Sequence, residues 1–288
     1  MTSILTETRR LLRIHGLQPK KRLGQSFLVD RNILGKILEG GELQQEDRVL
    51  EIGAGVGTLT HALAERCRRI VAVEVDPKLF QILQEVLGHK TQVTLVHGDA
   101  LRLDFGPLLG EERPWKVIAN LPYSIVTPLI TRLLNFSGCF SLLLLMVQEE
   151  VADRLIASPG KKSYGSLTVL AQYYADVRVV ARVPRGAFYP RPRVDSALLR
   201  LEPLPAPRVT PGDPALFFRL VRTAFAHRRK TLQNALMRSD WISLDREAIQ
   251  AILKRTGIDP SRRGETLTLQ EFRMLADHLL AKMDGVAA

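Results

Sequence analysis

Short apolar runs alternate with helical patterns over the first two thirds of the chain. The runs carry few polar side chains, as expected of strands that are buried on both faces of a sheet. Between them, apolar residues recur every three or four positions, which indicates amphipathic helices. Strands and helices in this order predict an α/β fold with a doubly wound, mostly parallel sheet. The predicted strands cover residues 49–52, 70–75, 93–96, 115–119 and 140–147.

Segments with helical periodicity follow most of these strands, and two of them have a proline near the start, where a helix tolerates it. Two later runs, 177–183 and 196–201, are predicted strands joined by a proline-rich loop. We expect them to form an antiparallel pair at one edge of the sheet. The predicted helices cover residues 59–63, 77–87, 125–134, 149–157 and 167–174.

Prolines at positions 203, 205, 207, 211 and 214 crowd together after the last predicted strand and predict a linker. Beyond it, the periodicity predicts helices over 216–237, 246–256 and 269–283. The chain is therefore predicted to have two domains. Residues 1–204 would form the α/β domain with a basic N-terminal arm, and residues 205–288 a small helical domain.

Composition and charge add a partner class to this picture. The 288 residues are 45% hydrophobic and 25% charged, as in ordinary soluble proteins. The net charge of +11 suits a polyanionic partner. The cysteines, Cys67 and Cys139, have no disulfide or metal-ligand spacing, and the longest apolar run, 142–147, is too short to span a bilayer. Together with Glu7, which is unusual in a transit peptide, these features predict a cytoplasmic protein without a metal or a membrane.

A glycine loop follows the first predicted strand. Gly53, Gly55 and Gly57 let the backbone turn sharply and approach a ligand closely. Position 58 is a threonine, where the dinucleotide fingerprint would need glycine. The loop therefore indicates a ligand site, although a glycine loop alone does not identify the ligand.

Acidic residues end the next two predicted strands. Glu74 lies 21 residues after Gly53, where a carboxylate can bind ribose hydroxyls, and Asp76 competes for that role. Asp99 follows the third strand, where it can reach an adenine ring. A helix cap or an exposed strand end would explain each acid singly. Their alignment with the glycine loop at the carboxyl ends of neighbouring strands favours a nucleoside ligand.

The tract Asn120-Leu121-Pro122-Tyr123 follows the fourth predicted strand. The Asn120 side-chain oxygen can accept a hydrogen bond from an exocyclic amine. Pro122 restricts the backbone so that nearby carbonyls can face the same amine. Tyr123 offers a face on which a base can stack. A turn is the competing interpretation of the tetrapeptide, and its place beside the other strand ends favours a clamp for adenine N6.

These motifs together resemble the class I, Rossmann-like S-adenosylmethionine-dependent methyltransferases. Their order is more specifically similar to the small-subunit ribosomal RNA adenine N6,N6-dimethyltransferases of the KsgA type, which also include large-subunit resistance enzymes. The resemblance runs from about Lys20 to Met237. Further matching segments are Leu23-Gly24-Gln25-Ser26-Phe27-Leu28, Tyr164-Gly165-Ser166-Leu167, the stretch 188–196 and the stretch 225–232.

The resemblance implies residue roles. Asn120, Pro122 and Tyr123 would be catalytic, because hydrogen bonds from N6 to the Asn120 side chain and the Pro122 carbonyl would aim its lone pair at the methyl group. Ser26 stands where the family usually has Asn or His, and Ser124 where Asn is frequent. The implied cofactor-binding residues are Ser26, Leu28, Gly53, Gly55, Glu74, Asp99 and Asn120.

Basic clusters complete the expectation of an RNA substrate. They comprise residues 20–22, the arginines between 178 and 193, and residues 227–230. Arginine forks suit phosphates, and interleaved aromatic rings suit unstacked bases. The predicted RNA-binding residues are Phe188, Arg191, Arg193, Arg228, Arg229 and Lys230.

Three functions remain open at this level. The first is dimethylation of two adjacent loop adenines in small-subunit (16S) rRNA by a monomer that acts on the rRNA or a pre-30S particle during subunit biogenesis. The second is methylation of adenine in large-subunit rRNA or DNA. The third is a non-catalytic assembly or nucleic-acid-binding factor on the same fold.

Overall fold

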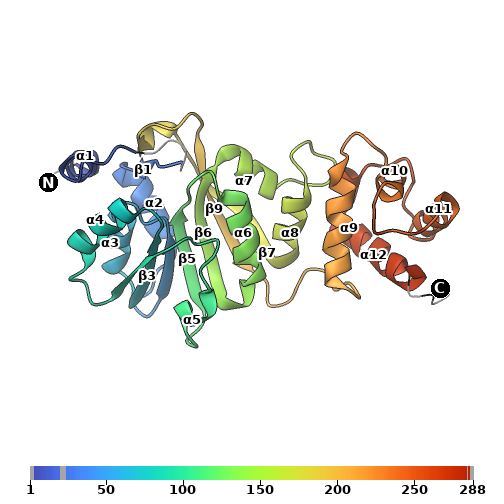
Figure 1. Cartoon of the computed structure of the whole chain (residues 1–288), viewed down its shortest axis with the longest axis horizontal. Coiled ribbons are helices and arrows are strands. Elements are labelled where there is room, and N and C mark those ends of the chain that lie inside the picture. The colour runs from blue at the N-terminus through green and yellow to red at the C-terminus, as the bar shows by residue number, and fades with distance from the viewer. Residues whose placement is uncertain (1–2, 20–23, 284, 286–288) are drawn as a thin grey trace. The chain divides into compact units, whose positions relative to one another are not determined.

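A computed structural model describes residues 3–19, 24–283 and 285. The chain divides into two compact units (Figure 1). An α/β unit contains residues 1–152 and 176–203, and a helical unit contains residues 153–175 and 204–288. The expected linker after position 203 lies where the chain passes from the α/β unit to the helical unit. The segment 153–175, which we expected in the first domain, belongs with the helical unit.

The α/β unit is built on a seven-stranded sheet in the order β4-β3-β2-β5-β6-β9-β7. The pairs from β4 to β6 are parallel, and β9 runs antiparallel to β6. The expected antiparallel edge is thus confirmed, with β9 inside β7. The strands are β2 (Arg48–Ile52), β3 (Arg69–Glu74), β4 (Val93–His97), β5 (Trp115–Asn120), β6 (Phe140–Gln148), β7 (Ala175–Val183) and β9 (Ser196–Pro203).

Side chains on both faces of the central strands are buried. On one face, Val49 and Ile118 pack in a cluster with residues of the helices 31–40 and 58–64. Their chain neighbours Leu50 and Val117 are also fully buried. Because neighbouring residues of a strand face opposite sides, helices and loops must cover both faces. The helices of this unit are α1 (Ile4–Ile14), α2 (Arg31–Gly40), α3 (Thr58–Ala64), α4 (Pro77–Leu87), α5 (Phe105–Leu109), α6 (Val126–Asn135) and α7 (Glu149–Leu155), which runs into the other unit.

A small second sheet ties two distant segments of the α/β unit together. Strand β1 (Phe27–Leu28) pairs antiparallel with β8 (Phe188–Tyr189), and Leu28 lies opposite Phe188. The two strands are only two residues long, which is too short for a recognisable sequence pattern. The pairing brings the segment after position 24 beside the proline-rich loop before β9.

The helical unit has a core of its own, which includes Phe217, Leu220, Phe272 and Leu279. The apolar face of α8 (Ser166–Tyr174) contributes to it, since the ring of Tyr173 lies 5.4 Å from that of Phe217. This contact explains why the segment groups with this unit. The remaining helices are α9 (Pro214–Ala226), α10 (Leu232–Met237), α11 (Arg246–Arg255) and α12 (Leu269–Met283).

The helix expected over 216–237 is broken, and this prediction was wrong at its centre. Helix α9 ends at Ala226, and α10 begins only at Leu232, after Thr231, whose side chain caps it by accepting from Asn234 N at 3.4 Å. In the gap, the Arg228 guanidinium donates to the backbone oxygens of Lys162 and Tyr164. Contacts to a segment more than sixty residues away thus override the local periodicity. In the part of the chain that the structure describes, no helix is both long and apolar enough to cross a lipid bilayer.

Candidate active site at the carboxyl edge of the sheet

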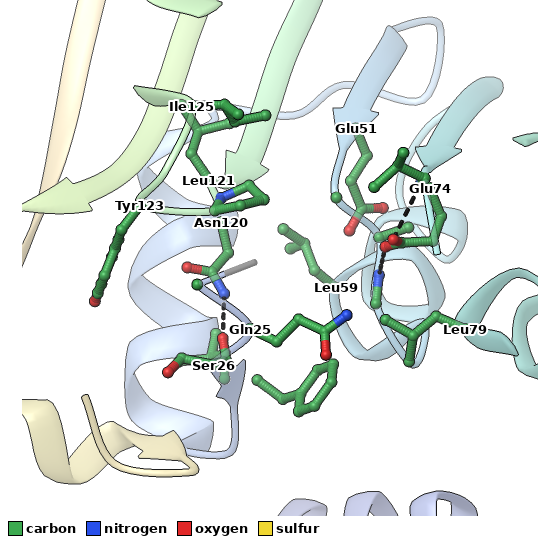
Figure 2. A pocket seen from close by; sticks show the side chains of 18 of the residues that line it. Gln25, Ser26, Glu51, Leu59, Glu74, Leu79, Asn120, Leu121, Tyr123 and Ile125 are labelled. Atoms are coloured by element: carbon green, nitrogen blue, oxygen red, sulfur yellow. Dashed lines mark hydrogen bonds between the residues drawn. The ribbon is translucent and has the colours of Figure 1, made fainter. Parts of the chain in front are cut away.

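A cavity of about 230 Å³ lies where β2, β3, β4 and β5 end (Figure 2). It is lined by the glycine loop, by the segment 24–28 and by the tract that begins at Asn120. The acidic lining side chains are Glu51, Glu74 and Asp99, and none of the described lining residues is Lys, Arg or His. Such a lining attracts a cation and repels a pyrophosphate. The site therefore fits an adenosine-bearing sulfonium better than a dinucleotide.

The glycine loop packs against both neighbouring motifs. Gly53, Gly55 and Gly57 all have positive φ angles, at 77°, 61° and 86°, which favours glycine. A Cβ at Gly53 would lie 3.2 Å from Cδ of Pro122, and one at Gly55 would lie 3.1 Å from the Phe27 ring. The absence of side chains at these glycines therefore lets the loop pack tightly against Phe27 and Pro122, and it also leaves space for a ligand.

Glu74 holds the glycine loop in place. It is 5% exposed, and its carboxylate accepts from Gly55 N at 2.9 Å, Val75 N at 3.0 Å and Asp76 N at 2.9 Å. Burial raises the pKa of Glu74, while these backbone donors oppose the rise. A carboxylate has about four acceptor sites, so three backbone donors leave capacity for a ligand hydroxyl.

Asp76, the competitor for the ribose role, has a different task. Its carboxylate caps α4 by accepting from Lys78 N at 3.0 Å, and it also accepts from the Gln25 side chain at 3.3 Å. It is buried and does not line the cavity, whereas Glu74 does. Their positions favour Glu74 for the ligand hydroxyls.

Asp99, which follows β4, also lines the cavity. One carboxylate oxygen accepts from Leu101 N at 2.9 Å, and the other lies 3.6 Å from Nε of the exposed Arg102 side chain. The Asp99 side chain is itself 39% exposed. Apolar side chains of Val75, Leu79 and Leu101 line the same cavity. Sequence reasoning missed these apolar walls, because a leucine that contacts a flat ring has no sequence signal that separates it from a core leucine.

Asn120 is held by the segment that covers the cavity. Its Nδ2 donates to the backbone oxygen of Ser26 at 3.0 Å. The Ser26 carbonyl can only accept, so the atom that faces it must be the amide nitrogen, and the orientation of the Asn120 amide is fixed. Its Oδ1 then has no donor among the described residues. Figure 2 shows that oxygen on the side of the Tyr123 ring. An exocyclic amine placed there would meet an acceptor.

The residues after Asn120 are tied to neighbouring elements. Leu121 N donates to Met146 O of β6 at 3.2 Å, and Pro122 O accepts from Ile125 N at 3.1 Å. The Pro122 carbonyl, predicted to accept from the amine, thus already has one donor and one lone pair left. The Tyr123 hydroxyl lies 2.6 Å from Oγ of Ser196, a fully buried residue at the start of β9.

Removing this hydroxyl pair is expected to weaken RNA binding selectively. In Ser196→Ala the Tyr123 hydroxyl loses this hydrogen bond, and we expect KM for RNA to rise about threefold to tenfold, the worth of one hydrogen bond, with cofactor affinity unchanged. Tyr123→Phe should give a similar rise. The double variant should show no further loss, because both changes remove one interaction. Steady-state kinetics measure this, with Ser141→Ala at the opposite end of β6 as the matched control.

The two cofactor contacts expected in the segment 24–28 differ in character. The Ser26 hydroxyl donates to Pro190 O at 3.0 Å, so its side chain fastens the proline-rich loop. The Ser26 backbone holds Asn120, as described. Leu28 is buried and lines the cavity. Residues 20–23, which include the basic cluster 20–22, lie outside the described residues.

A second cavity, of about 720 Å³, adjoins the first and shares Gln25, Ser26 and Tyr123 with it. Arg191 and Arg193 line this cavity with exposed side chains. The structure therefore places the predicted RNA-binding arginines of this loop in the same cavity lining as Tyr123.

The structure corrects the expectation for Phe188. Its side chain is 4% exposed, belongs to the hydrophobic core and lines neither cavity. Its strand pairing with β1 turns it inward, so it supports the site rather than stacks on a base.

The basic residues of the helical unit also divide. Arg228 donates to backbone oxygens, as described, and pairs with Glu265 at 3.2 Å. Arg229 and Lys230 are exposed. Arg228 therefore has a structural role in this unit. Because its side chain is also 47% exposed, all three residues stay candidates for RNA contacts. Among residues 3–19, 24–283 and 285, no group of His, Cys, Asp and Glu side chains could hold a metal ion.

Glu51 is the acidic lining residue that sequence reasoning passed over. It is 2% exposed at the penultimate position of β2, and burial raises its pKa to about 8. A carboxyl within the run Val49-Leu50-Glu51-Ile52 was the available signal, because buried strands rarely carry an acid without a reason.

The sheet order, the glycine loop and the acidic strand ends define a class I methyltransferase that uses S-adenosylmethionine. The chain belongs to the ribosomal RNA adenine dimethylase family, whose model matches residues 16–279.

Named relatives agree with this assignment. The chain is 48% identical over 281 residues to "Ribosomal RNA small subunit methyltransferase A" of Pelotomaculum thermopropionicum, with 94% of this chain and 95% of that protein covered. Among solved structures, a dimethyladenosine transferase from Plasmodium falciparum shares the fold, with a TM-score of 0.75, 24% identity and coverage of 89% and 97%. The 23S rRNA methyltransferase ErmE follows with a TM-score of 0.65, 26% identity and coverage of 88% and 99%.

Proposed function

We propose that this enzyme transfers methyl groups to N6 of two adjacent adenines in a loop of small-subunit (16S) rRNA. It would act as a cytoplasmic monomer on the rRNA or a pre-30S particle, during subunit biogenesis. The observation that carries the proposal is the amide orientation of Asn120, because its bond to Ser26 leaves an acceptor oxygen beside the Tyr123 ring.

S-adenosylmethionine supplies the methyl group as an electrophilic carbon on a positively charged sulfur. Glu74 and Asp99 would hold its ribose and adenine, and Gly53, Gly55 and Leu28 would line its path. These assignments rest on the places of the residues around the first cavity.

The chain activates the target by orientation. Adenine N6 is a poor nucleophile because its lone pair is delocalised into the ring. Acceptance of its hydrogens by Asn120 Oδ1 and by the Pro122 carbonyl favours a tetrahedral nitrogen whose lone pair faces the methyl group. Alignment of bound reactants supplies several powers of ten in effective concentration. No strong base is needed, because the methylated nitrogen is acidic and passes its proton to water.

The target adenine must be unpaired, since a stacked base in a duplex cannot enter the site. The second cavity offers an approach for a single strand, with Tyr123 at its junction with the first cavity. Tyr123 can stack on the extruded base. Arg191 and Arg193 can neutralise the flanking phosphates.

RNA binding is expected to depend steeply on salt, and Arg191 should account for part of that dependence. Neutralisation of phosphates releases counterions, so each lost contact lowers the slope of log K against log salt by about 1. Filter binding of Arg191→Ala across a salt series measures the slope. Arg66→Ala, at an exposed arginine that lines neither cavity, is the matched control and should keep the wild-type slope. A wild-type affinity that is insensitive to salt would contradict this model of binding.

The direct test of the function is incubation of small subunits that lack the modification with labelled S-adenosylmethionine. Mapping should place the label on N6 of two neighbouring loop adenines. Large subunits and DNA serve as competing substrates in the same assay. Label on either of them, with none on small subunits, would reject the proposed substrate.

A further inference from the structure

Glu51 is a buried acid at the cofactor site to which the mechanism gives no task. Its carboxyl points into the first cavity beside Leu59 and Glu74 (Figure 2). Although the side chain is 2% exposed, its Oε2 has no hydrogen-bond partner among the described residues. Buried polar atoms are usually paired, so an unpaired one that faces a cavity indicates a missing partner.

No described Lys, Arg or His lines the cavity that Glu51 faces. Glu74 of β3 and Asp99 after β4 line the same cavity with acids, and Thr60 of α3 adds only a hydroxyl. The thiol of Cys67 is neutral, because burial raises its pKa to about 12. On the neighbouring strand β5, Lys116 is bound to Asp47 at 2.7 Å and to the backbone oxygens of Gly41 and Glu42.

This environment disfavours the ionised carboxyl. Burial is the main cause of the raised pKa of Glu51, about 8, and the charge of Glu74 adds to it, while Thr60 opposes it. Near neutral pH the group therefore carries a proton in the free protein. A positive charge brought into the cavity would reverse this preference, because an opposite charge at close range favours the ionised form.

We propose that Glu51 is the counterion for the positive charge of the methyl donor, and that it gives up its proton to the solvent when the donor binds. The inference rests on the proposed function only in its use of S-adenosylmethionine. One proton leaves, and the new carboxylate pairs with a charge on the ligand. The ligand has two such charges, the sulfonium and the α-ammonium group.

Proton release on ligand binding tests the proposal. Calorimetry at pH 7 in two buffers of different ionisation enthalpy gives the protons released for each ligand bound. We expect release of about one proton with S-adenosylmethionine and none with 5′-methylthioadenosine, which lacks both charges. S-adenosylhomocysteine keeps only the ammonium. Release with it assigns the ammonium as the partner, and no release assigns the sulfonium.

Glu51→Gln supplies the second arm. Oε2 meets no donor with good geometry among the described residues, and an amide oxygen can still accept from the neighbouring Thr60 hydroxyl, so glutamine should fit at this position. Wild-type affinity for S-adenosylmethionine should tighten about tenfold between pH 6 and pH 7, since the ligand selects the ionised form below the free pKa. The variant should lose this slope and most of the proton release. Glu46→Gln, at a side chain that is 84% exposed, should behave as wild type.

Three results would overturn the proposal. They are wild-type binding of S-adenosylmethionine without proton release, equal release with 5′-methylthioadenosine, and undiminished release in Glu51→Gln. If the variant does not fold, the ligand series on the wild-type protein still decides. Tight binding without release rejects the role of Glu51 alone, whereas no binding of S-adenosylmethionine rejects the proposed function as well.

Discussion

Asn120→Ala is expected to reduce methyl transfer to RNA by about 10²- to 10³-fold, the usual effect of removing one group that acts in the transition state. The substitution deletes the acceptor Oδ1 and the donor that binds Ser26 O. The orientation of the amine is then lost. Single-turnover transfer of labelled methyl groups to small subunits measures this loss.

Binding measurements separate the possible origins of that loss. RNA affinity should stay within about threefold of wild type, because Tyr123 and the arginines are retained. Asn135→Ala, at an exposed residue at the end of α6, is the matched control. Unchanged methylation in Asn120→Ala would reject the catalytic assignment. Abolished methylation with intact subunit binding would leave a non-catalytic assembly role open alongside catalysis.

Glu74→Ala is expected to have the second largest effect, on cofactor affinity and on stability together. It removes the acceptor for Gly55 N, Val75 N and Asp76 N. Unsatisfied buried donors cost about 1–3 kcal/mol each, so the loss of their shared acceptor should lower the free energy of unfolding by about 3 kcal/mol or more. Cofactor affinity should fall by about 100-fold or more, since the glycine loop loses its support. Denaturant titration and calorimetry measure the two effects.

The conservative change at this position should not rescue either property. A glutamine has only one acceptor oxygen. Its NH₂ group would face a backbone N–H that a carboxylate oxygen accepts from in the wild-type protein, so two donors would oppose each other. We therefore expect Glu74→Gln to lose nearly as much cofactor affinity as Glu74→Ala. Glu51→Gln, one strand away, should keep the fold, since no described donor meets Oε2. Equal tolerance of glutamine at both positions would contradict the hydrogen-bond arrangement described for Glu74.

The central sheet could be predicted because its strands are continuous apolar runs that end in distinctive residues. Each predicted strand from 49–52 to 140–147 matches an observed one within about two residues. Their carboxyl ends then had to meet at one edge, which placed the glycine loop, Glu74, Asp99 and Asn120 around one cavity. This part of the site follows from local pattern and parallel topology.

Elements that depend on distant partners could not be predicted. Strands β1 and β8 are held by pairing across about 160 residues, and that pairing turns Phe188 into the core. The break between α9 and α10 depends on bonds from Arg228 to residues 162 and 164. Helix α2 contains two glycines, which weaken its helical pattern, and the Asp30 cap was its remaining signal.

The interleaving of the two units has a consequence for synthesis and for truncation. The core of the helical unit needs Tyr164, Val169 and Tyr173, which the ribosome makes before residues 176–203 complete the sheet. During translation, the apolar face of α8 therefore stays unpacked until α9 and α12 have been synthesised. A fragment that starts at position 204 lacks this face. The helical unit is therefore not a separable C-terminal module. A stop codon before α12 would remove part of its core, so the shortened chain should not fold this unit stably.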